Sequence, residues 1–362
     1  MPSSPPVPER PFPVNLKPAI AVTLIALTAL SGCSRAGSGD TPAAESKGAA
    51  AEVRLGYFPN ITHAAALIGV ENGLFTKELG STKLTTQTFN AGPDEVNALL
   101  GESLDIAYIG SGPAINAYAK SKGEAVKLIA GATSGGAQLV VKPEINSIEE
   151  LRGKVVATPQ LANTQDVSLK KYLAEKNLTG QVTVQNVENA ASLDLFKKGD
   201  IQAAWAPQPW SARLVAEAGA KVLLDEKTLW DGGAFPTTVV IVRTKFLQEH
   251  PETVEAVLKG HVAAIDWAKA NKDEAKKAAN AHLEKLTSKK LGDKILDAAW
   301  DNIELTTDAQ AKHFPQLAKD AVTAGVAKEA ANVAGYADFT LLNKVLQAQG
   351  KPQVQAAGLD KK

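Results

Sequence analysis

Between residues 52 and 250, short apolar runs alternate with longer segments whose apolar positions recur at helical spacing. Residues 52–57 (EVRLGY) alternate apolar and polar side chains, and residues 104–109 (LDIAYI) form a short, almost wholly apolar run. Such runs are typical of half-buried and fully buried strands. Helical spacing follows in segments such as residues 63–72 and 164–176. Repeated strand–helix units predict an α/β fold in which helices cover mostly parallel sheets.

The remaining elements are expected from the same two patterns. Further strands are expected at residues 84–89, 126–133, 139–142, 154–158, 181–185, 203–206, 221–224 and 237–242. Further helices are expected at residues 93–100, 114–122, 147–151, 191–198 and 209–218. From Pro251 to the end, Ala, Lys, Glu and Leu dominate and the pattern is helical, so this part is expected to pack back onto the body.

The N-terminal segment has the parts of a secretory signal peptide. Residues 19–30 (AIAVTLIALTAL) are apolar or nearly so, and Arg10 and Lys17 precede them. Two small residues then lead to Cys33, the single cysteine of the chain. The apolar run is shorter than the about 20 residues that a membrane-spanning helix needs, which favours a signal peptide.

Residues 30–33 (Leu-Ser-Gly-Cys) resemble a bacterial lipobox. The resemblance implies that residues 1–32 are a lipoprotein signal peptide and that Cys33 carries the lipid, which would hold the protein on a membrane. The alternative is an ordinary signal peptide followed by a chance cysteine. Residues 33–51 lack the aromatic and branched apolar residues needed for a core, so we expect a flexible tether there.

Charge and cysteine content narrow the possible partners. Without residues 1–32, the 39 basic and 39 acidic residues fall to 37 and 38. A net charge this close to zero gives no large electrostatic field, so nucleic acid is not expected as a partner and a bound anion must be held by local geometry. With Cys33 lipidated, no disulfide can form, and the remaining length is enough for about two domains.

Patterns that would indicate an enzyme or a metal site are missing from the sequence. The histidines are too far apart for an HxxxH or HExxH motif: His63, His250, His261, His282 and His313. There is no GxSxG elbow, Walker loop or GxGxxG turn. Carboxylate pairs such as Glu149 and Glu150 fall on polar helical faces. We therefore expect no catalysis, no cofactor and no metal.

Three loops of small polar residues follow strands and open helices. They are residues 59–62 (PNIT), 110–113 (GSGP) and 159–164 (PQLANT). Helix starts expose unpaired N–H groups and a partial positive charge, and in α/β sheets they gather where ligands bind. Together they could hold an anion without any lysine or arginine. The alternative is that these residues only cap their helices.

Residues 203–210 (AAWAPQPW) are a second unusual segment. Prolines stiffen this loop and fix the direction of two indole rings, which could line the apolar part of a ligand. The alternative is that Trp205 and Trp210 fill the core. Arg213 could supply a cation to the pocket, but a surface position is the simpler interpretation.

Taken in order, four segments resemble the solute-binding proteins of the nitrate, sulfonate and taurine class of ABC importers. They are residues 55–75 (LGYFPNITHAAALIGVENGLF), residues 89–113 with GESLDIAYIG before SGP, residues 158–167 (TPQLANTQDV) and residues 199–214 (GDIQAAWAPQPWSARL). The resemblance covers about residues 52–260, and the helical tail is similar only in character. It implies a periplasmic-binding-protein type II fold of two lobes with mixed, mostly parallel sheets and a helical C-terminal part.

The resemblance also implies domain boundaries. Residues 52–137 together with 237–362 would form the first lobe, and residues 138–236 the second. Residues 133–136 (TSGG) and 235–237 (FPT) would be the two hinge strands that absorb lobe closure.

The ligand would lie between the lobes and contact residues from both. Those expected at the ligand are Asn60, Thr62, His63, Ser111, Gly112, Thr133, Ser134, Asn163, Thr164, Gln165, Trp205 and Gln208. Asp166 lies in the first turn of its helix, where it is expected to cap the start rather than to meet an anion. His63 is a possible pH-sensitive donor.

The expected function is capture of a small organic anion by a monomeric lipoprotein outside the cytoplasm. An aliphatic sulfonate or taurine suits the donors and indoles best, and nitrate or bicarbonate are possible. The partners would be an ABC permease, with its ATPase across the membrane, and the membrane itself through the N-terminal lipid. Alternatives on the same fold are a thiamine-precursor pyrimidine stacked on Trp205 or Tyr57, a sensing subunit, and an enzyme.

Overall fold

The computed structural model describes residues 46–361, which lie within one compact unit, Ala43–Lys362. The predicted signal peptide, Cys33 and most of the predicted tether lie outside the described residues. The last residues of the predicted tether pack against the body of the protein. Ala50 is buried and its N–H donates to Thr253 Oγ1 over 2.8 Å, while Lys47 pairs with Glu249. None of the described helices is long and apolar enough to cross a bilayer.

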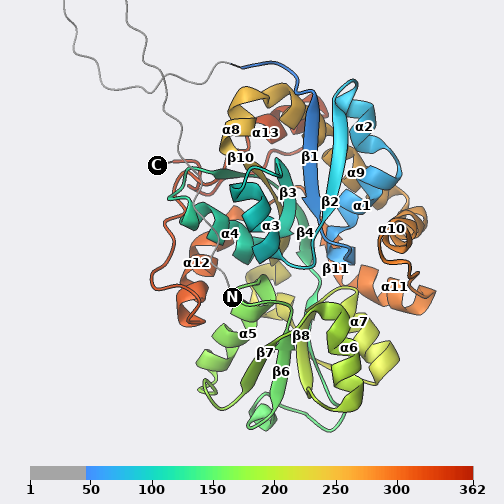
Figure 1. The fold of residues 1–362 in the computed structure, drawn as a ribbon, viewed down its shortest axis with the longest axis vertical. Helices are drawn as coiled ribbons and strands as arrows, with labels where there is room; N and C mark the ends of the chain where they lie inside the picture. The colour runs from blue at the N-terminus through green and yellow to red at the C-terminus, as the bar shows by residue number, and fades with distance from the viewer. Residues whose placement is uncertain (1–45, 362) are drawn as a thin grey trace, which may run out of the picture. The chain divides into compact units, whose positions relative to one another are not determined.

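The chain folds around two β-sheets (Figure 1). The first is six-stranded, in the order β11-β4-β10-β3-β1-β2. Its strands are β1 (Glu52–Tyr57), β2 (Lys83–Thr88), β3 (Ile106–Gly110), β4 (Val126–Gly135), β10 (Pro236–Arg243) and β11 (Ile303–Leu305). The second is five-stranded, in the order β7-β6-β8-β5-β9. Its strands are β5 (Ala137–Val141), β6 (Val155–Thr158), β7 (Thr183–Asn186), β8 (Ala203–Pro207) and β9 (Lys221–Asp225).

Both sheets are mixed, with most strands of each running in one direction, as expected. Strand β1 pairs in parallel with β2 and β3, and β6 pairs in parallel with β7 and β8. Strand β10 runs antiparallel to β3 and β4, and β5 runs antiparallel to β8 and β9. Strands β5 and β10 begin directly after the chain passes from one sheet to the other, so their direction is set by that passage, while the short strand β11 runs antiparallel to β4 at the sheet edge.

Helices cover both sheets. Those before residue 250 are α1 (Ala64–Glu71), α2 (Leu74–Leu79), α3 (Gly92–Leu100), α4 (Ser111–Lys120), α5 (Thr164–Glu175), α6 (Asn189–Lys198), α7 (Trp210–Ala218) and α8 (Thr244–Glu249). The C-terminal part adds α9 (Pro251–Ala270), α10 (Lys272–Thr287), α11 (Asp293–Asp301), α12 (Phe314–Thr323) and α13 (Thr340–Ala348). Short 3-10 helices are η1 (Ile61–His63), η2 (Glu149–Leu151), η3 (Glu226–Leu229), η4 (Asp231–Gly233) and η5 (Ala311–His313).

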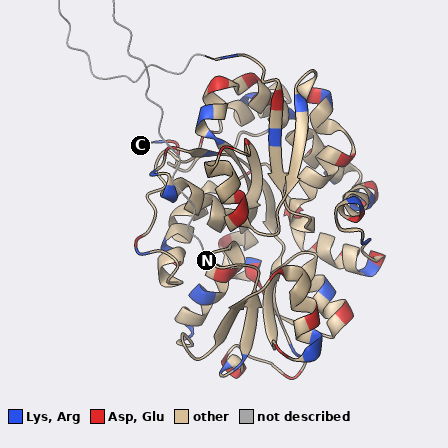
Figure 2. Ribbon diagram, viewed as in Figure 1, with Lys and Arg blue, Asp and Glu red and all other residues tan. Residues whose placement is uncertain are grey.

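The C-terminal helices pack around the six-stranded sheet, as expected of the helical tail. Helix α9 lies against α1, α2 and α13, and α12 lies beside α4 and α5 (Figure 1). The tail is not purely helical, however, because β11 adds a three-residue edge strand to β4. Basic and acidic side chains are interspersed, mostly on the helices (Figure 2).

Each sheet has its own apolar core. The largest core surrounds the six-stranded sheet and includes Leu55, Ile106, Val240 and Val257. The five-stranded sheet has a separate cluster on each face. Leu139 and Leu169 lie in one cluster, under α5, and Val140 and Phe196 lie in the other, under α6 and α7. Successive residues Leu139 and Val140 point to opposite faces, as the pleat of a strand requires.

The two chain passages, which are the segments where the chain crosses from one sheet to the other, lie side by side. Gly135 N–H donates to Phe235 O over 2.9 Å, and the Thr237 hydroxyl donates to Gly135 O. Gly135 and Gly136 adopt φ values of 68° and 88°, which only glycine tolerates readily. The predicted hinge segments therefore contact each other. The positive φ values of Gly135 and Gly136 let the chain turn sharply there.

Candidate functional site

Two helix starts, one from each sheet, meet where their strands end. Helix α4 begins directly after β3, and α5 begins six residues after β6. Gly112 N–H donates to Thr164 Oγ1 over 3.3 Å. A Cβ at Gly110 would collide with the same Thr164 oxygen. The sequence GSGP thus supplies glycines where the backbone of α4 approaches α5 most closely.

A small polar cavity of about 20 Å³ lies beside this contact. Its lining residues are Phe58, Asn60, Thr62, His63, Asn90, Gly110, Asn163, Thr164, Gln165, Asn189, Pro207, Thr237 and Thr238. These come from both sheets and from the loops after β1, β3 and β6. The volume is that of about one water molecule, so a larger ligand requires the walls to separate before they close on it.

Two hydroxyl groups at the cavity are buried without a partner. Thr238 lines the cavity and is 1% exposed, and Ser111 directly follows the lining residue Gly110 and is 0% exposed. Neither Thr238 Oγ1 nor Ser111 Oγ has a hydrogen-bond partner. A buried hydroxyl left unpaired costs about 1–3 kcal/mol. Such groups are therefore available to a ligand that enters the cavity.

His63 is a neutral donor in this wall. Phe58 N–H donates to His63 Nδ1 over 3.3 Å, and the two rings pack with centroids 4.4 Å apart. Burial lowers the pKa of His63 to about 3, so the ring is uncharged at neutral pH. Because Nδ1 accepts a hydrogen bond, the single proton of the neutral ring resides on Nε2. The histidine can donate to an anion without carrying a charge.

The amide side chains are oriented by bonds to their oxygen atoms. Asn60 Oδ1 accepts from Trp210 Nε1 over 2.8 Å. Gln165 Oε1 accepts from Asn163 Nδ2 over 3.2 Å. With these oxygens occupied, the NH₂ groups of Asn60 and Gln165 remain as donors. The wall is therefore rich in donors, and none of its side chains carries a formal charge.

Six of the predicted ligand residues line this cavity together: Asn60, Thr62, His63, Asn163, Thr164 and Gln165. Ser111 and Gly112, the first residues of α4, follow the lining residue Gly110 but do not line the cavity themselves. Thr62 does not cap its helix through its side chain, in contrast to the sequence-based interpretation of that loop. Its backbone is instead fixed, because Thr133 Oγ1 donates to Thr62 O over 2.6 Å.

Four other predicted residues, Thr133, Ser134, Trp205 and Gln208, do not line the cavity either. Thr133 supports Thr62, and Ser134 Oγ accepts from Gln310 Nε2 over 2.8 Å. Gln208 bonds to Asn302 Oδ1 over 3.3 Å and to the N–H of Ala212, next to the chain passages. These polar side chains stabilise the region where the sheets meet, because buried polar groups find protein partners when no ligand reaches them.

The placement of Trp205 at the ligand is corrected by the structure. Its ring is fully buried in the core under α5, and Nε1 donates to Glu226 Oε2 over 3.1 Å. Tyr57 is also fully buried and bonds to His282 Nε2 over 2.9 Å. Neither residue offers a face for a stacked pyrimidine. The indole that reaches the cavity wall is that of Trp210, through Asn60.

The structure also places two further residues that the sequence singled out. Asp166 holds the start of α5, since its carboxylate accepts from the N–H of Ala162 over 2.9 Å and from Thr158 Oγ1 over 3.0 Å. Arg213 lies over the Trp210 ring, 4.8 Å from its centroid, and pairs with Glu217 over 2.8 Å. It is a supporting residue behind the wall rather than the cation of the site.

Sequence reasoning missed Asn90, Asn189, Thr237 and Thr238. The two threonines form a polar pair at the start of the otherwise apolar run PTTVVIVR, and that contrast was a usable signal. Asn90 and Asn189 belong to ordinary-looking loop ends, which the tertiary fold alone brings to the cavity. Over residues 46–361, no group of three or more His, Cys, Asp or Glu could hold a metal ion.

Comparison with known proteins gives a consistent picture. The NMT1-like family matches residues 46–283. A taurine-binding periplasmic protein of Escherichia coli (strain K12) is 32% identical over 211 residues, which cover 58% of this chain and 64% of the relative, just under two thirds of its length. A putative aliphatic sulfonates-binding protein of Bacillus subtilis (strain 168) is 25% identical over 267 residues, covering 72% of this chain and 76% of the relative.

Solved structures of similar fold come from the same class. The alkanesulfonate-binding protein SsuA from Xanthomonas axonopodis pv. citri, bound to MOPS, has a TM-score of 0.66 at 17% identity and covers 82% of this chain and 98% of its own. The nitrate-binding protein NrtA from Synechocystis PCC 6803 has a TM-score of 0.68 at 15% identity and covers 83% and 90%. The predicted periplasmic-binding fold is thereby confirmed.

Proposed function

The chain belongs to the NMT1-like family, and from that premise we propose that it is the extracytoplasmic solute-binding component of an ABC importer that captures a small organic anion. An aliphatic sulfonate or taurine is the favoured ligand, and nitrate or bicarbonate are smaller alternatives. The observation that carries the proposal is the donor-rich, uncharged cavity at the starts of α4 and α5, with the unpartnered hydroxyl of Thr238 in its wall and that of Ser111 next to the lining residue Gly110.

The anion would be held by dipoles rather than by a counter-charge. The starts of α4 and α5 present backbone N–H groups and partial positive charge to the same place. Asn60, His63 and Gln165 add side-chain donors. Three sulfonate oxygens offer several acceptors, which suits a wall rich in donors.

The lobes would be residues 52–137 with 237–362, and residues 138–236. The ligand would enter while α4 and α5 are apart, and lobe closure would bring Gly112 and Thr164 together around it. The hinge would be the paired passages at residues 133–136 and 235–237, where Gly135 and Gly136 allow the backbone to turn.

The protein would reach its partner from the membrane surface. Lipid on Cys33 would keep the monomeric body near the permease, which would receive the anion while its ATPase works across the membrane. Mass spectrometry of the mature N-terminus tests this part directly. Unmodified Cys33, or cleavage at another position, would contradict it.

Calorimetric titration tests the ligand class. Ethanesulfonate, taurine, nitrate and bicarbonate would be titrated separately, and saturable heat with an organic sulfonate is expected. Thr238→Val removes one unpartnered hydroxyl and keeps the shape, so the affinity should fall about tenfold or more, because a hydrogen bond to a charged group contributes about 1.5–3 kcal/mol.

Thr244→Val is the matched control. Thr244 Oγ1 is also buried without a partner, but Thr244 does not line the cavity, so its substitution should leave binding unchanged. Absence of heat with every anion would refute the proposed ligand class. Equal losses in both variants would show that Thr238 acts through stability and not through contact with the ligand.

A further inference from the structure

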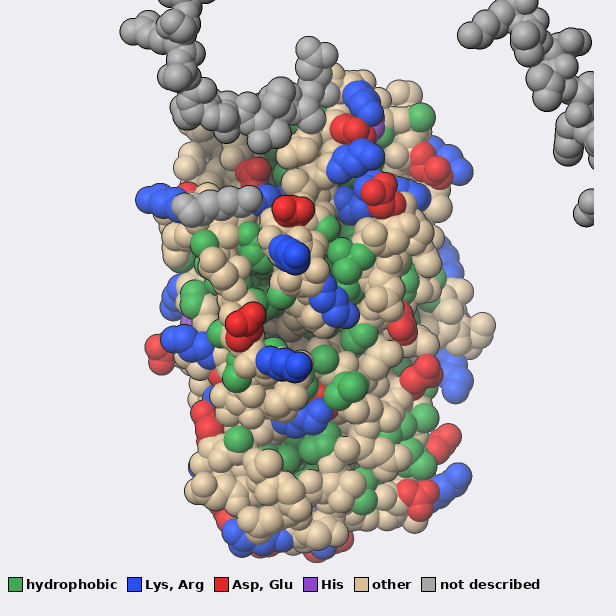
Figure 3. All heavy atoms as spheres, turned by 60° about the vertical axis from the view of Figure 1, so that its left-hand side comes forward, with side chains coloured by type: hydrophobic (Ala, Val, Ile, Leu, Met, Phe, Trp, Pro, Cys, Tyr) green, Lys and Arg blue, Asp and Glu red, His purple; other side chains and the backbone are tan. Residues whose placement is uncertain are grey.

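A second and much larger pocket, of about 680 Å³, lies on the other side of the contact between Gly112 and Thr164. Helices α4, α5 and α12, the segment 326–334 and the 3-10 helix η3 with the following Trp230 contribute its walls. The face brought forward in Figure 3 is hollowed, with hydrophobic and charged side chains around the opening. Its volume is within the range of about 300–1,000 Å³ that small-molecule sites occupy.

This pocket is separate from the small polar cavity. Thr164, which accepts a hydrogen bond from Gly112 N–H, is the one residue that lines both spaces. The two spaces also differ in chemistry. Neutral donors line the small cavity, whereas the large pocket has mostly apolar walls, which include Ile115, Val167, Leu229, Trp230, Leu317 and Val326.

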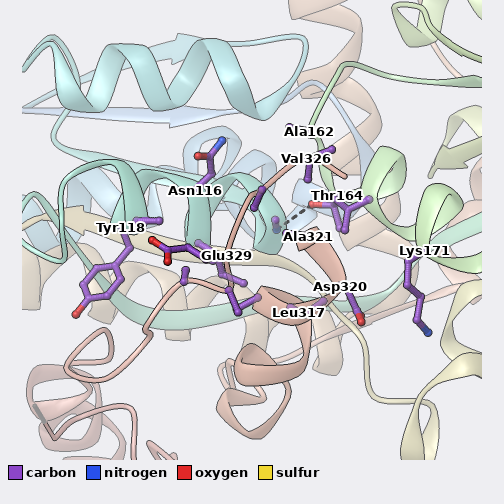
Figure 4. A pocket seen from close by; sticks show the side chains of 18 of the residues that line it. Asn116, Tyr118, Ala162, Thr164, Lys171, Leu317, Asp320, Ala321, Val326 and Glu329 are labelled. Carbon is purple, nitrogen blue, oxygen red and sulfur yellow. Dashed lines mark hydrogen bonds between the residues drawn. The ribbon is translucent and has the colours of Figure 1, made fainter. Parts of the chain in front are cut away.

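Two buried carboxyl groups belong to the wall of the large pocket. Glu226 is 0% exposed, and its Oε2 accepts from Trp205 Nε1 over 3.1 Å, while its Oε1 has no partner. Asp320 is 4% exposed, and its Oδ1 accepts from Gln316 Nε2 over 2.8 Å. Figure 4 shows Asp320 and the neighbouring side chains of this pocket. Burial raises the pKa of both groups, that of Glu226 to about 7.

Neither carboxyl group has an ion-pair partner within 4.0 Å among residues 46–361. Lys171 lines the pocket and Figure 4 shows its side chain close to Asp320, but its Nζ pairs with Glu175 Oε1 over 2.9 Å. Acidic groups are rarely this buried without a counter-charge, because burial without one is costly. Lys171 acts on both acids through space but forms no ion pair with either, so a cation placed between them would supply the direct contact that the described residues do not.

We propose that this pocket is a second ligand site, for an organic ammonium compound whose apolar body packs against Ile115, Leu317 and Val326 while its charged nitrogen lies near Glu226 and Asp320. The site does not depend on the anion cavity, and the two ligands are of opposite charge. The apolar walls select for the body of the ligand and the two acids select for its charge.

The test compares two probes of the same shape by calorimetry. Cyclohexylmethylammonium should bind saturably, and the neutral cyclohexylmethanol should bind at least tenfold more weakly. Glu226→Gln keeps an acceptor for the Trp205 indole and removes the charge, so it should weaken binding of the ammonium probe about tenfold. Glu329→Gln is the matched control, because Glu329 lines the same pocket but is exposed.

Two further variants keep the result unambiguous. Lys171→Met removes a competing cation and should tighten binding of the ammonium probe severalfold. Val326→Trp fills the pocket and should abolish binding of both probes. Thermal unfolding of each variant shows that it is folded, and titration with ethanesulfonate, which should be unaffected by Glu226→Gln, separates this site from the anion cavity.

Equal affinity for the ammonium and the alcohol would overturn the proposal, and so would an unchanged affinity for the ammonium in Glu226→Gln. Binding of ethanesulfonate can fail while the ammonium still binds, or the reverse. A failure of this proposal can therefore be distinguished from a failure of the proposed anion site.

Discussion

Trp210 Nε1 donates to Asn60 Oδ1 over 2.8 Å, joining residues that are 150 positions apart in the chain. Trp210 opens α7, which packs on the five-stranded sheet, and Asn60 follows β1 of the six-stranded sheet. The bond therefore links the two halves of the body and fixes the Asn60 amide with its NH₂ group free. It is a positioning contact for the anion cavity.

Replacing this indole should weaken anion binding. Trp210→Phe removes the donor but keeps an aromatic ring, so Asn60 is no longer held in one orientation. We expect ethanesulfonate affinity to fall about threefold to tenfold, which corresponds to the about 0.5–1.5 kcal/mol of one neutral hydrogen bond. Trp267→Phe, in α9 and away from the cavity, is the control for loss of an indole. Calorimetry that finds the same affinity in both variants would argue against a positioning role.

Lobe closure should depend on the absence of a side chain at Gly110. Gly110→Ala places a methyl group against Thr164 Oγ1, which keeps α4 and α5 apart. We expect at least a tenfold loss of affinity, and small-angle scattering with saturating ethanesulfonate should show a larger radius of gyration than for the unmodified protein.

A matched glycine and a compensating change complete this experiment. Gly292 has φ −67° and open space around the position of a Cβ. Gly292→Ala should therefore change neither the affinity for ethanesulfonate nor the radius of gyration. Adding Thr164→Ala to Gly110→Ala removes the colliding oxygen and should restore compaction, although not full affinity. An open double variant would show that the collision is not what limits closure.

Binding of a sulfonate should be nearly independent of pH between about 5 and 8. The pKa of His63 is lowered to about 3 by burial, so the ring stays neutral across this range, and no other titratable side chain lines the cavity. Ethanesulfonate remains an anion throughout. Titrations at pH 5.5, 7 and 8 should give affinities within about twofold. A tenfold rise in affinity for each pH unit of acidification would mean that a protonated histidine holds the ligand.

Glu95 should make the protein less stable as the pH rises. It is fully buried in the first turn of α3, both carboxylate oxygens lack partners, and burial raises its pKa well above the usual value. The folded state then binds the proton more tightly than the unfolded state, whose pKa is about 4.3. Stability therefore falls as the pH rises from about 4.3 toward the folded-state pKa.

Glu95→Gln removes that proton linkage. At pH 8 the variant should be more stable than the unmodified protein in urea unfolding, and the difference should shrink toward pH 4. The exposed Glu124→Gln is the control and should show no such trend. A variant that is less stable at pH 8 would mean that the charged form of Glu95 is favoured in the folded protein.

Local sequence patterns were sufficient to predict most of the strands and helices. The alternation in EVRLGY placed a strand at residues 52–57, and the structure has β1 at Glu52–Tyr57. The polar loop before residue 164 placed the start of a helix there, and α5 begins at Thr164. Side-chain periodicity and helix-start chemistry are properties of a few neighbouring residues, so they can be read without knowing what packs against them.

The three-residue strand β11 could not be found in this way. Residues 303–305 lie within a stretch rich in helix-forming residues, and they become a strand because the edge of β4 is available for pairing. The antiparallel direction of β10 has a similar origin, since it depends on how the chain returns from the second sheet to the first.

The sequence by itself determined the α/β elements, the loops with exposed N–H groups and the set of polar residues from which a site could be built. Tertiary structure alone decided that Trp205 faces the core under α5 while Trp210 reaches Asn60, and that Thr238 completes the wall of the cavity. The reason is that a strand's pleat and a helix's period fix which residues share a face. Which face is covered, and by what, depends on contacts between segments far apart in the chain.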